Sequence, residues 1–312
     1  MRNLFVRGKL YLLAILLICV SSISAQQVTG ASSPLTVNPG NFTIIDPNLQ
    51  VAGSGNITDF TVQIVGNYYQ GDELSFDGGL ADSLGITGSY TTMSGVTGIL
   101  NFSGTASPAS WQALFRTVSF RNTTAECGPG NRQIQFMSGR YLYNQFNGHY
   151  YEYVGDNLNW KQAKDAAANR SYNGLQGYLA TSSSQAENNF IWKLIASDAW
   201  VGSTYDYTEL VAAGVTAYAD QAAAIGKVYW VTGPEKGTFV SSGLGSPVAQ
   251  NGQYMNWNPG EPNNYSNTAE YYTQLYSSQQ GRWNDLPISS QLPYLVEYGG
   301  MPGDIPQNNN YS

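Results

Sequence analysis

Oxygen-bearing side chains gather between Asn256 and Asp285, near the C-terminal end of the chain. They are three carboxylates and two amides: Glu261, Glu270, Asp285, Asn263 and Asn284. A hard cation such as Ca²⁺ takes about six to eight oxygen ligands in a flexible cage. These five side chains and one backbone carbonyl, which we assign to Asp285, supply about six ligands and leave about two positions for a bound molecule. The pattern therefore predicts a calcium site that also contacts a ligand.

Pro262 separates two of these residues, Glu261 and Asn263. An X–Pro bond adopts the cis form at a penalty of only about 0.5–1 kcal/mol. A cis bond here would let both side chains present oxygens to one point, whereas in trans they would diverge. A Glu-Pro-Asn tripeptide alone is more typical of a surface turn. The Trp283-Asn284-Asp285 run, at a distance that suits a facing strand, favours the metal site instead.

Other chemistries fit this region less well. Mg²⁺ demands tight octahedral geometry and retains its waters, and Zn²⁺ prefers His or Cys, which this stretch lacks. A hydrolase with paired carboxylates is a third alternative, but calcium would keep the three acids ionised and leave no general acid. The only histidine, His149, is expected to be structural. We therefore expect a protein that is not an enzyme.

Composition and charge indicate which classes of molecule the protein can bind. Hydrophobic residues make up 42% of the 312 residues, aromatic residues 13% and charged residues 11%, which is typical of a folded, loop-rich protein. Residues 1–25 combine Arg2, Arg7 and Lys9 with a short apolar run, which predicts a secretory signal peptide. Its removal leaves 11 basic and 21 acidic residues, a formal charge of −10, so we expect no nucleic-acid partner.

The exported product is predicted to be secreted or held at the cell surface, with no transmembrane segment. Only Cys127 survives the predicted cleavage, so no intramolecular disulfide is expected. Residues 26–140 alternate apolar and polar side chains between turn residues, which predicts an all-β sandwich without helices. The runs 98–104 and 111–120 loosely resemble cadherin-like repeats of bacterial surface adhesins, and this implies a spacer domain.

Residues 141–300 differ from the preceding region in composition and pattern, with many tyrosines and two predicted helices. The first helix begins after Asn159, with Gln162 completing a capping box. The second begins near Ser184, with Glu187 three residues later. Residues 204–228 leave a loop and a short extra helix open as alternatives. Trp257 and Trp283 could stack on a sugar, although core packing is favoured. Residues 301–312 are expected to be a flexible tail.

The region from Tyr141 to Gly300 resembles the C-type lectin-like domain. The resemblance is carried by ordered motifs: Gly148-His149-Tyr150-Tyr151-Glu152, the helix with Trp160, Gly177-Tyr178-Leu179-Ala180-Thr181, Ala199-Trp200-Val201-Gly202, Glu261-Pro262-Asn263, Trp283-Asn284-Asp285 and Tyr294-Leu295-Val296-Glu297-Tyr298. It implies an α+β, double-looped fold with paired terminal strands, two flanking helices and a long calcium loop.

The resemblance also implies the ligands. Glu261, Asn263, Glu270, Asn284 and Asp285 would bind both Ca²⁺ and the sugar, and Glu-Pro-Asn goes with mannose-type sugars in this family. Two vicinal equatorial hydroxyls, as in mannose, glucose or fucose, would reach the metal, accept from Asn amides and donate to Glu carboxylates. Exchanging acid and amide reverses this donor order and favours galactose-type sugars.

Two departures from the family pattern stand out. The cysteines that form disulfides in this family are absent. Tyr272 and Leu295 or Val296 lie near the positions where they would fall. Tyr271 follows Glu270, which weakens a second calcium site for which Asn264 is the only candidate, and the loop to Glu270 is one residue longer than expected. We expect a calcium-dependent carbohydrate-binding, adhesin-like protein. The alternative is a calcium-stabilised module that binds a surface protein, matrix or ice.

Overall fold

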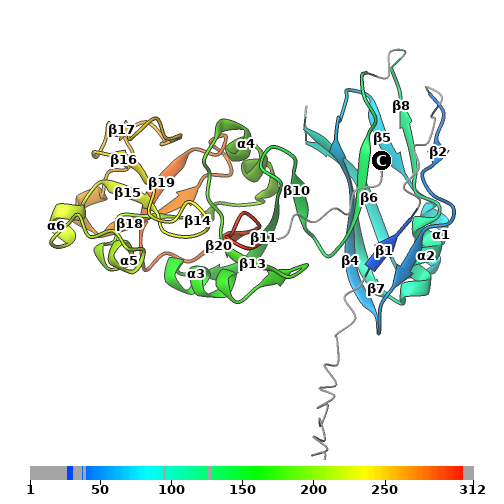
Figure 1. The fold of residues 1–312 in the computed structure, drawn as a ribbon, viewed down its shortest axis with the longest axis horizontal. Helices are drawn as coiled ribbons and strands as arrows, with labels where there is room; N and C mark the ends of the chain where they lie inside the picture. Colours follow the sequence, from blue (N-terminus) through cyan, green and yellow to red (C-terminus); the bar gives the residue numbers. More distant parts are fainter. Residues whose placement is uncertain (1–26, 31–36, 38–39, 94–95, 125–127, 305–312) are drawn as a thin grey trace, which may run out of the picture.

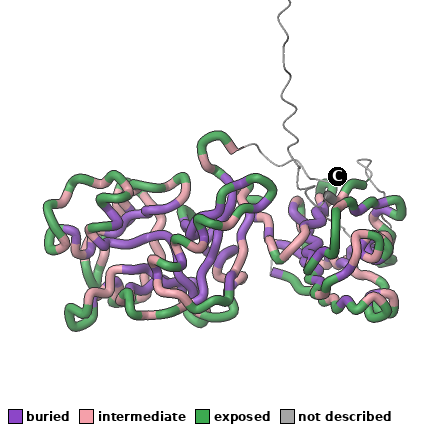
Figure 2. Tube along the Cα trace, turned by 90° about the horizontal axis from the view of Figure 1, so that it is seen from below, coloured by how far each residue is buried: buried purple, intermediate pink, exposed green. Residues whose placement is uncertain are grey.

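The computed structural model describes residues 27–30, 37, 40–93, 96–124 and 128–304. The predicted signal peptide (residues 1–25), Cys127 and most of the predicted tail (residues 301–312) lie outside these residues. The segments up to residue 138 and from residue 142 onward form separate sheets, shown at opposite ends of Figure 1. In Figure 2 the buried residues run through the interior of both parts, so each has its own core.

Two antiparallel sheets make up most of the N-terminal part. One has the strand order β6-β7-β4-β9, and the other has the order β2-β8-β5. Their bounds are β2 (Thr43–Ile44), β4 (Ile57–Gly66), β5 (Asp72–Ser75), β6 (Thr87–Met93), β7 (Thr97–Ala106), β8 (Ser119–Asn122) and β9 (Gln133–Ser138). A short pair joins β1 (Gln27–Thr29) to β3 (Gln50–Ala52). Side chains from both larger sheets, such as Val62 and Phe120, share one core.

The N-terminal part also contains two helices, so the prediction that it is entirely β was wrong. Helix α1 (Gly78–Ser83) begins after Asp77, and α2 (Pro108–Phe115) begins after Ser107, whose side chain accepts from the Ser110 amide. Pro108 occupies the first turn of α2, where its missing N–H costs nothing. Trp111 is fully buried and donates to the Ile57 carbonyl. This helix signal, a Ser followed by a Pro, is present in the sequence.

The second face of β4 is buried as well, although its residues are partly polar. Gln63 exchanges two hydrogen bonds of 2.8 Å with the backbone of Tyr143, which lies on β10 (Leu142–Asn144). On the neighbouring strand β9, Gln135 donates to the Tyr150 hydroxyl at 2.9 Å. The first strands of the C-terminal part therefore cover the outer face of the four-stranded sheet, and Gln63 satisfies the Tyr143 backbone there.

The C-terminal part is built on one large branched sheet of mainly antiparallel strands, ordered β10-β11-β20-β14-β15-β16-β17, with β13 and β18 branching from it. The bounds are β11 (His149–Leu158), β12 (Ser171–Tyr172), β13 (Leu175–Leu179), β14 (Ala199–Thr204), β15 (Lys227–Trp230), β16 (Phe239–Ser242), β17 (Val248–Ala249), β18 (Glu270–Leu275), β19 (Trp283–Pro287) and β20 (Leu292–Tyr298). Strands β11 and β20 pair antiparallel, with Tyr150 opposite Tyr298. The terminal strands of this part are therefore paired, as expected.

Both predicted helices are confirmed. Helix α3 (Trp160–Ala168) has the predicted capping box between Asn159 and Gln162. Helix α4 (Gln185–Leu194) begins after Ser184, but the Glu187 carboxylate accepts from the backbone and hydroxyl of Ser183, outside the helix. Residues 204–228, for which a loop and a short helix were both open, contain two short helices, α5 (Tyr207–Ala212) and α6 (Gln221–Ala224). The described part of the chain is a mixed α+β structure with few helices.

Large buried side chains occupy the positions in the C-terminal part where the family pattern would place stapling cysteines. Tyr272 is buried, packs at a tilt against Trp160 with ring centroids 5.1 Å apart, and donates to Asp206. Leu295 and Val296 are fully buried in β20. Burying large side chains of this kind stabilises by about 1.5–3 kcal/mol each, which offsets the missing cross-links. No helix among the described residues is long and apolar enough to cross a membrane.

Candidate functional site: a carboxylate-rich loop beside strand β19

The loop before Glu261 is fastened to the start of β19 by the backbone. The Trp283 amide donates to the Asn256 carbonyl at 2.8 Å, and the Asn258 amide donates to the Trp283 carbonyl at 2.9 Å. Trp283 is fully buried, and its indole N–H donates to Asn188 on α4 at 2.8 Å. Because Trp283 is held on both sides, the loop has a fixed position relative to Asn284 and Asp285. Trp283 is thus a core residue, as favoured by the sequence.

The Glu261–Pro262 peptide bond is cis, as the metal-site hypothesis requires. Oε2 of Glu261 and Oδ1 of Asn263 are both buried, and neither has a hydrogen-bond partner within the described structure. Leaving a buried acceptor unsatisfied costs about 1–3 kcal/mol, so such atoms in native proteins are usually satisfied by water, ions or ligands. The two residues that flank Pro262 therefore each hold an oxygen acceptor that the chain itself does not use.

Asp285 joins the two sides of the loop. It is 1% exposed, and its two carboxylate oxygens accept from the backbone amides of Asn263 (3.0 Å) and Asn264 (2.9 Å). The Tyr205 hydroxyl lies within hydrogen-bonding distance of the same carboxylate and of the Glu270 carbonyl. Tyr205 was not predicted as a site residue, because it comes from a distant segment directly after β14.

Glu270 is fixed by two hydrogen bonds within the loop. Its carboxylate accepts from the Tyr265 amide at 2.8 Å, and its own amide donates to the Asn264 side chain at 3.1 Å. Asn264, the only candidate for a second calcium site, is therefore a buried residue that organises the loop. Asn284 is buried too, but its amide donates to the backbone carbonyl of Asp285 at 2.9 Å.

Electrostatic repulsion accumulates among Glu261, Glu270 and Asp285, which we call the loop acids. Burial, and then the charges of Asp285 and Glu270, raise the pKa of Glu261 to about 7. Burial also raises the pKa of Glu270, the Tyr265 amide lowers it, and the Asp285 charge adds to the rise. No Lys or Arg side chain among the described residues forms an ion pair with a loop acid. A divalent cation would relieve this repulsion.

The loop has the oxygen donors that Ca²⁺ prefers, in an arrangement that is only partly ready for it. Glu261, Asn263, Glu270 and Asp285 are brought together, and two of their oxygens are unsatisfied. Within the described ranges, no three Asp, Glu, His or Cys side chains are arranged as a metal site on their own. The Asp285 carbonyl that we assigned to the metal is occupied by Asn284. Metal binding through that carbonyl requires the Asn284 amide to turn.

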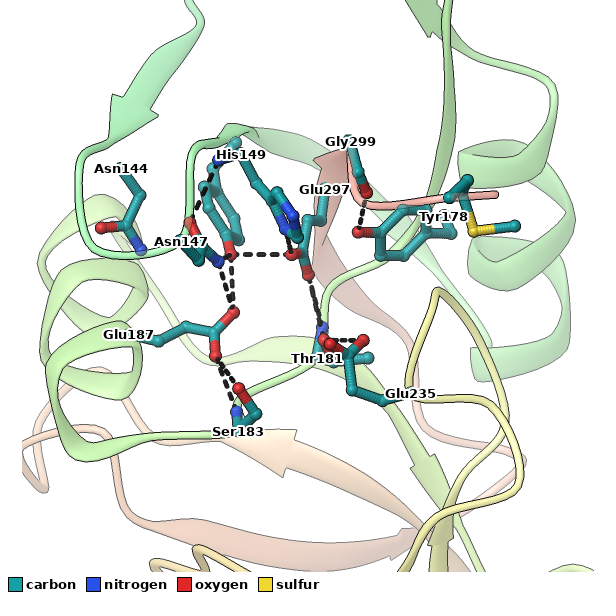
Figure 3. A network of polar contacts seen from close by, with 12 residues as sticks. Asn144, Asn147, His149, Tyr178, Thr181, Ser183, Glu187, Glu235, Glu297 and Gly299 are labelled. Atoms are coloured by element: carbon teal, nitrogen blue, oxygen red, sulfur yellow. Dashed lines mark hydrogen bonds and ion pairs between the residues drawn. The ribbon is translucent and has the colours of Figure 1, made fainter. Parts of the chain in front are cut away.

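A second acidic cluster lies in the core between β11, β20 and α4 (Figure 3). His149 Nδ1 lies 2.6 Å from Oε1 of the fully buried Glu297, whose Oε2 accepts from the Thr181 amide at 2.9 Å. The Tyr151 hydroxyl lies 2.6 Å from Glu187 and 2.8 Å from Glu297. We call His149, Glu187, Glu235 and Glu297 the core cluster. The expectation that His149 is structural agrees with this burial.

The core cluster has strongly perturbed protonation. Burial lowers the pKa of His149, but the hydrogen bond and charge of Glu297 outweigh it, and the net pKa is raised. Burial and the Glu297 charge raise the pKa of Glu187, and hydrogen bonds from Tyr151 and Ser183 lower it. The net effect is a pKa of about 7. Burial and the same charge raise the pKa of Glu235. One histidine and several hydroxyl and amide donors therefore stabilise this cluster without an added cation.

Comparison with known proteins gives relatives in sequence and in structure. No family model matches the chain. Halomucin of Haloquadratum walsbyi is 34% identical over 270 residues, which covers 84% of this chain and 3% of halomucin. The chain thus spans only a small fraction of that relative's length.

Solved structures similar to the chain include the C-type lectin CEL-I from Cucumaria echinata (21% identity, TM-score 0.37, covering 52% of this chain and 96% of CEL-I). A calcium-independent type II antifreeze protein is also similar (15% identity, TM-score 0.33, covering 50% of this chain and 89% of the antifreeze protein).

Proposed function

We propose that residues 141–300 form a C-type lectin-like module that binds Ca²⁺ and, through it, glycans with vicinal equatorial hydroxyls. The protein would be exported or held at the cell surface, with residues 26–140 as an adhesin-like, cadherin-like spacer. We infer no catalytic role. The order of motifs, the paired strands β11 and β20 and the two helices support this proposal.

The pair of unsatisfied oxygens beside Pro262 carries the proposal. Glu261 Oε2 and Asn263 Oδ1 are buried acceptors on either side of one proline, next to the buried carboxylate of Asp285 on β19. A bound calcium would supply the positive charge that the loop acids lack and would hold two sugar hydroxyls. Glu261, Asn263, Glu270, Asn284 and Asp285 would bind the metal, and their free lone pairs and amide protons would orient the sugar.

The alternative, a calcium-stabilised module that binds protein, matrix or ice, is favoured by one observation. Leu244 (41% exposed), Val248 (64%) and Tyr265 (68%) are large apolar side chains exposed around the same loop. The Gly245 amide donates to the Pro262 carbonyl at 2.7 Å, so the segment with Leu244 lies directly against the calcium loop. Exposed apolar side chains that gather around a site are typical of contact with a macromolecular surface.

Glycan binding of the chain from residue 26 onward tests the preferred function. We expect retention on immobilised mannose in calcium, release by a chelator, and weak retention on galactose. A site that contacts two hydroxyls binds a monosaccharide with a Kd on the order of 1 mM, so the immobilised sugar must be dense. The double variant Glu261→Gln with Asn263→Asp should reverse the preference toward galactose, because it reverses the donor order.

Matched variants separate the two candidates. Asp82→Asn removes an exposed acid on α1, far from the loop in sequence, and should behave as the wild type. Val248→Ser should leave mannose retention unchanged, since its side chain points to solvent. Calcium binding without retention on any sugar, together with partner binding lost in Val248→Ser, would overturn the lectin function and support the alternative.

A further inference from the structure

A small cavity lies beside the proposed calcium loop and shares Glu261 with it. Its volume is about 290 Å³, and its lining includes Pro247, Trp257, Asn258, Glu261 and Arg282. Pockets that hold small molecules begin at roughly 300 Å³, so this one has room for about one sugar ring. Trp257 forms a fixed wall, because its indole N–H donates to Ser241 at 3.0 Å and its ring meets Trp283 edge-on at 5.6 Å.

Arg282 differs from every other arginine in the described structure. Arg121, Arg132, Arg140 and Arg170 form ion pairs with acids, and Arg116 donates to a backbone carbonyl. Arg282 is half-buried, and its side chain has no hydrogen-bond or ion-pair partner within the described ranges. Glu261 lines the same cavity, yet no nitrogen of Arg282 lies within 4.0 Å of its carboxylate.

The backbone of Arg282 is held in place on both sides. The Gly281 carbonyl accepts from Asn188 at 3.0 Å and from Asn256 at 2.8 Å, and the Arg282 carbonyl accepts from the Tyr276 amide at 2.8 Å. Gly281 has a φ of +68°, and an added Cβ would lie 2.7 Å from the Trp192 Cβ. The arginine therefore extends from a fixed backbone at the wall of the cavity.

We propose that this cavity is a subsite for the anionic substituent of an acidic sugar, with Arg282 as its specificity-determining residue. This inference depends on the proposed function, in which the loop calcium holds two hydroxyls of the same sugar. A guanidinium fork matches the planar carboxylate of a uronic acid and also accepts a sulfate. The Trp257 indole would lie against the apolar face of the ring.

Two sugars that differ only at one carbon provide the test. Methyl glucoside and methyl glucuronide share the equatorial vicinal hydroxyls, and only the second carries a carboxylate; methyl glucose 6-sulfate distinguishes sulfate from carboxylate. Each is titrated into the wild-type chain in saturating calcium. We expect the glucuronide to bind about tenfold more tightly than the glucoside, as one added charge-assisted hydrogen-bond pair predicts. A preference for the sulfate instead would assign the subsite to sulfated sugars.

Arg282→Gln should bring the ratio of the two affinities to about one. Lys236→Gln removes an exposed cation that lies outside the cavity and has no side-chain partner among the described residues, and it should keep the tenfold ratio. Equal affinities in the wild type, or an unchanged ratio in Arg282→Gln, with calcium-dependent glucoside binding intact, would overturn the subsite alone. Loss of calcium-dependent binding of every sugar would overturn the proposed function and the subsite with it.

Discussion

The loop acids and the core cluster each bring three carboxylates together within the C-terminal part, and they differ in what neutralises them. In the core cluster both oxygens of Glu187 and both of Glu297 accept hydrogen bonds, and His149 lies 2.6 Å from Glu297. In the loop, buried oxygens of Glu261 and Asn263 have no partner, and no Lys or Arg pairs with the acids among the residues described.

The difference separates a structural cluster from a binding one. Buried polar networks are stabilising when every member is satisfied, whereas a half-satisfied network costs free energy unless a ligand completes it. By this criterion the core cluster is part of the fold, and the unsatisfied oxygens of the loop support the proposed cation site. Counting acidic side chains alone would not have distinguished them.

The largest effect is expected from the core cluster. Glu297→Ala removes the partner of His149 and leaves the Thr181 amide without its acceptor, while Tyr151 keeps Glu187. Truncating one partner of a buried ion pair typically costs about 3–5 kcal/mol. We expect a loss of this size in the free energy of unfolding, measured by urea denaturation of the calcium-free protein. A loss below about 1 kcal/mol would show that the core cluster is not structural.

A pH effect of intermediate size follows from Glu187. Its folded-state pKa, about 7, lies above the ordinary value of 4.5. The folded state therefore binds the proton more tightly, and the stability from Glu187 is present below pH 4.5 and is lost as the pH rises toward 7. The pKa of His149 is also raised, so its contribution to folding stability is likewise lost as the pH rises above 6.5.

Glu187→Gln should remove its share of this dependence. Between pH 4.5 and 8 we expect the wild type to lose on the order of 2 kcal/mol relative to Glu187→Gln. Chemical denaturation at both pH values measures the difference, with Asp82→Asn as the control. A wild type that gains stability relative to Glu187→Gln over this interval would contradict the sign.

A smaller effect is expected in the loop without calcium. Glu261→Gln removes a repelling charge from beside Asp285 and Glu270, so the calcium-free protein should be stabilised rather than weakened. Because Glu261 is partly solvated, we expect a gain of at most about 1 kcal/mol. The same variant should lose the rise in Tm that calcium gives the wild type. A clear destabilisation of the calcium-free variant would indicate that Glu261 is a fold residue.

Local signals in the sequence predicted much of this structure. The capping box at Asn159, the cap at Ser184 and the cis bond before Pro262 depend on residues close together in the chain, and all three are present. Helix α2 was not predicted, although its start signal, Ser107-Pro108, is also local in the chain. Tyr205, the burial of β4 on both faces and the unpaired state of Arg282 depend on distant packing, which spacing in the sequence does not encode.

Calorimetric titration of Ca²⁺ into the wild type, Glu261→Gln and Glu187→Gln tests the central claim most directly. The wild type and Glu187→Gln should both bind calcium saturably, and Glu261→Gln should lose at least about 100-fold in affinity, since it removes a charged ligand from the cage. Calcium binding that survives in Glu261→Gln but disappears in Glu187→Gln would contradict the account, because the cation would then belong to the core cluster.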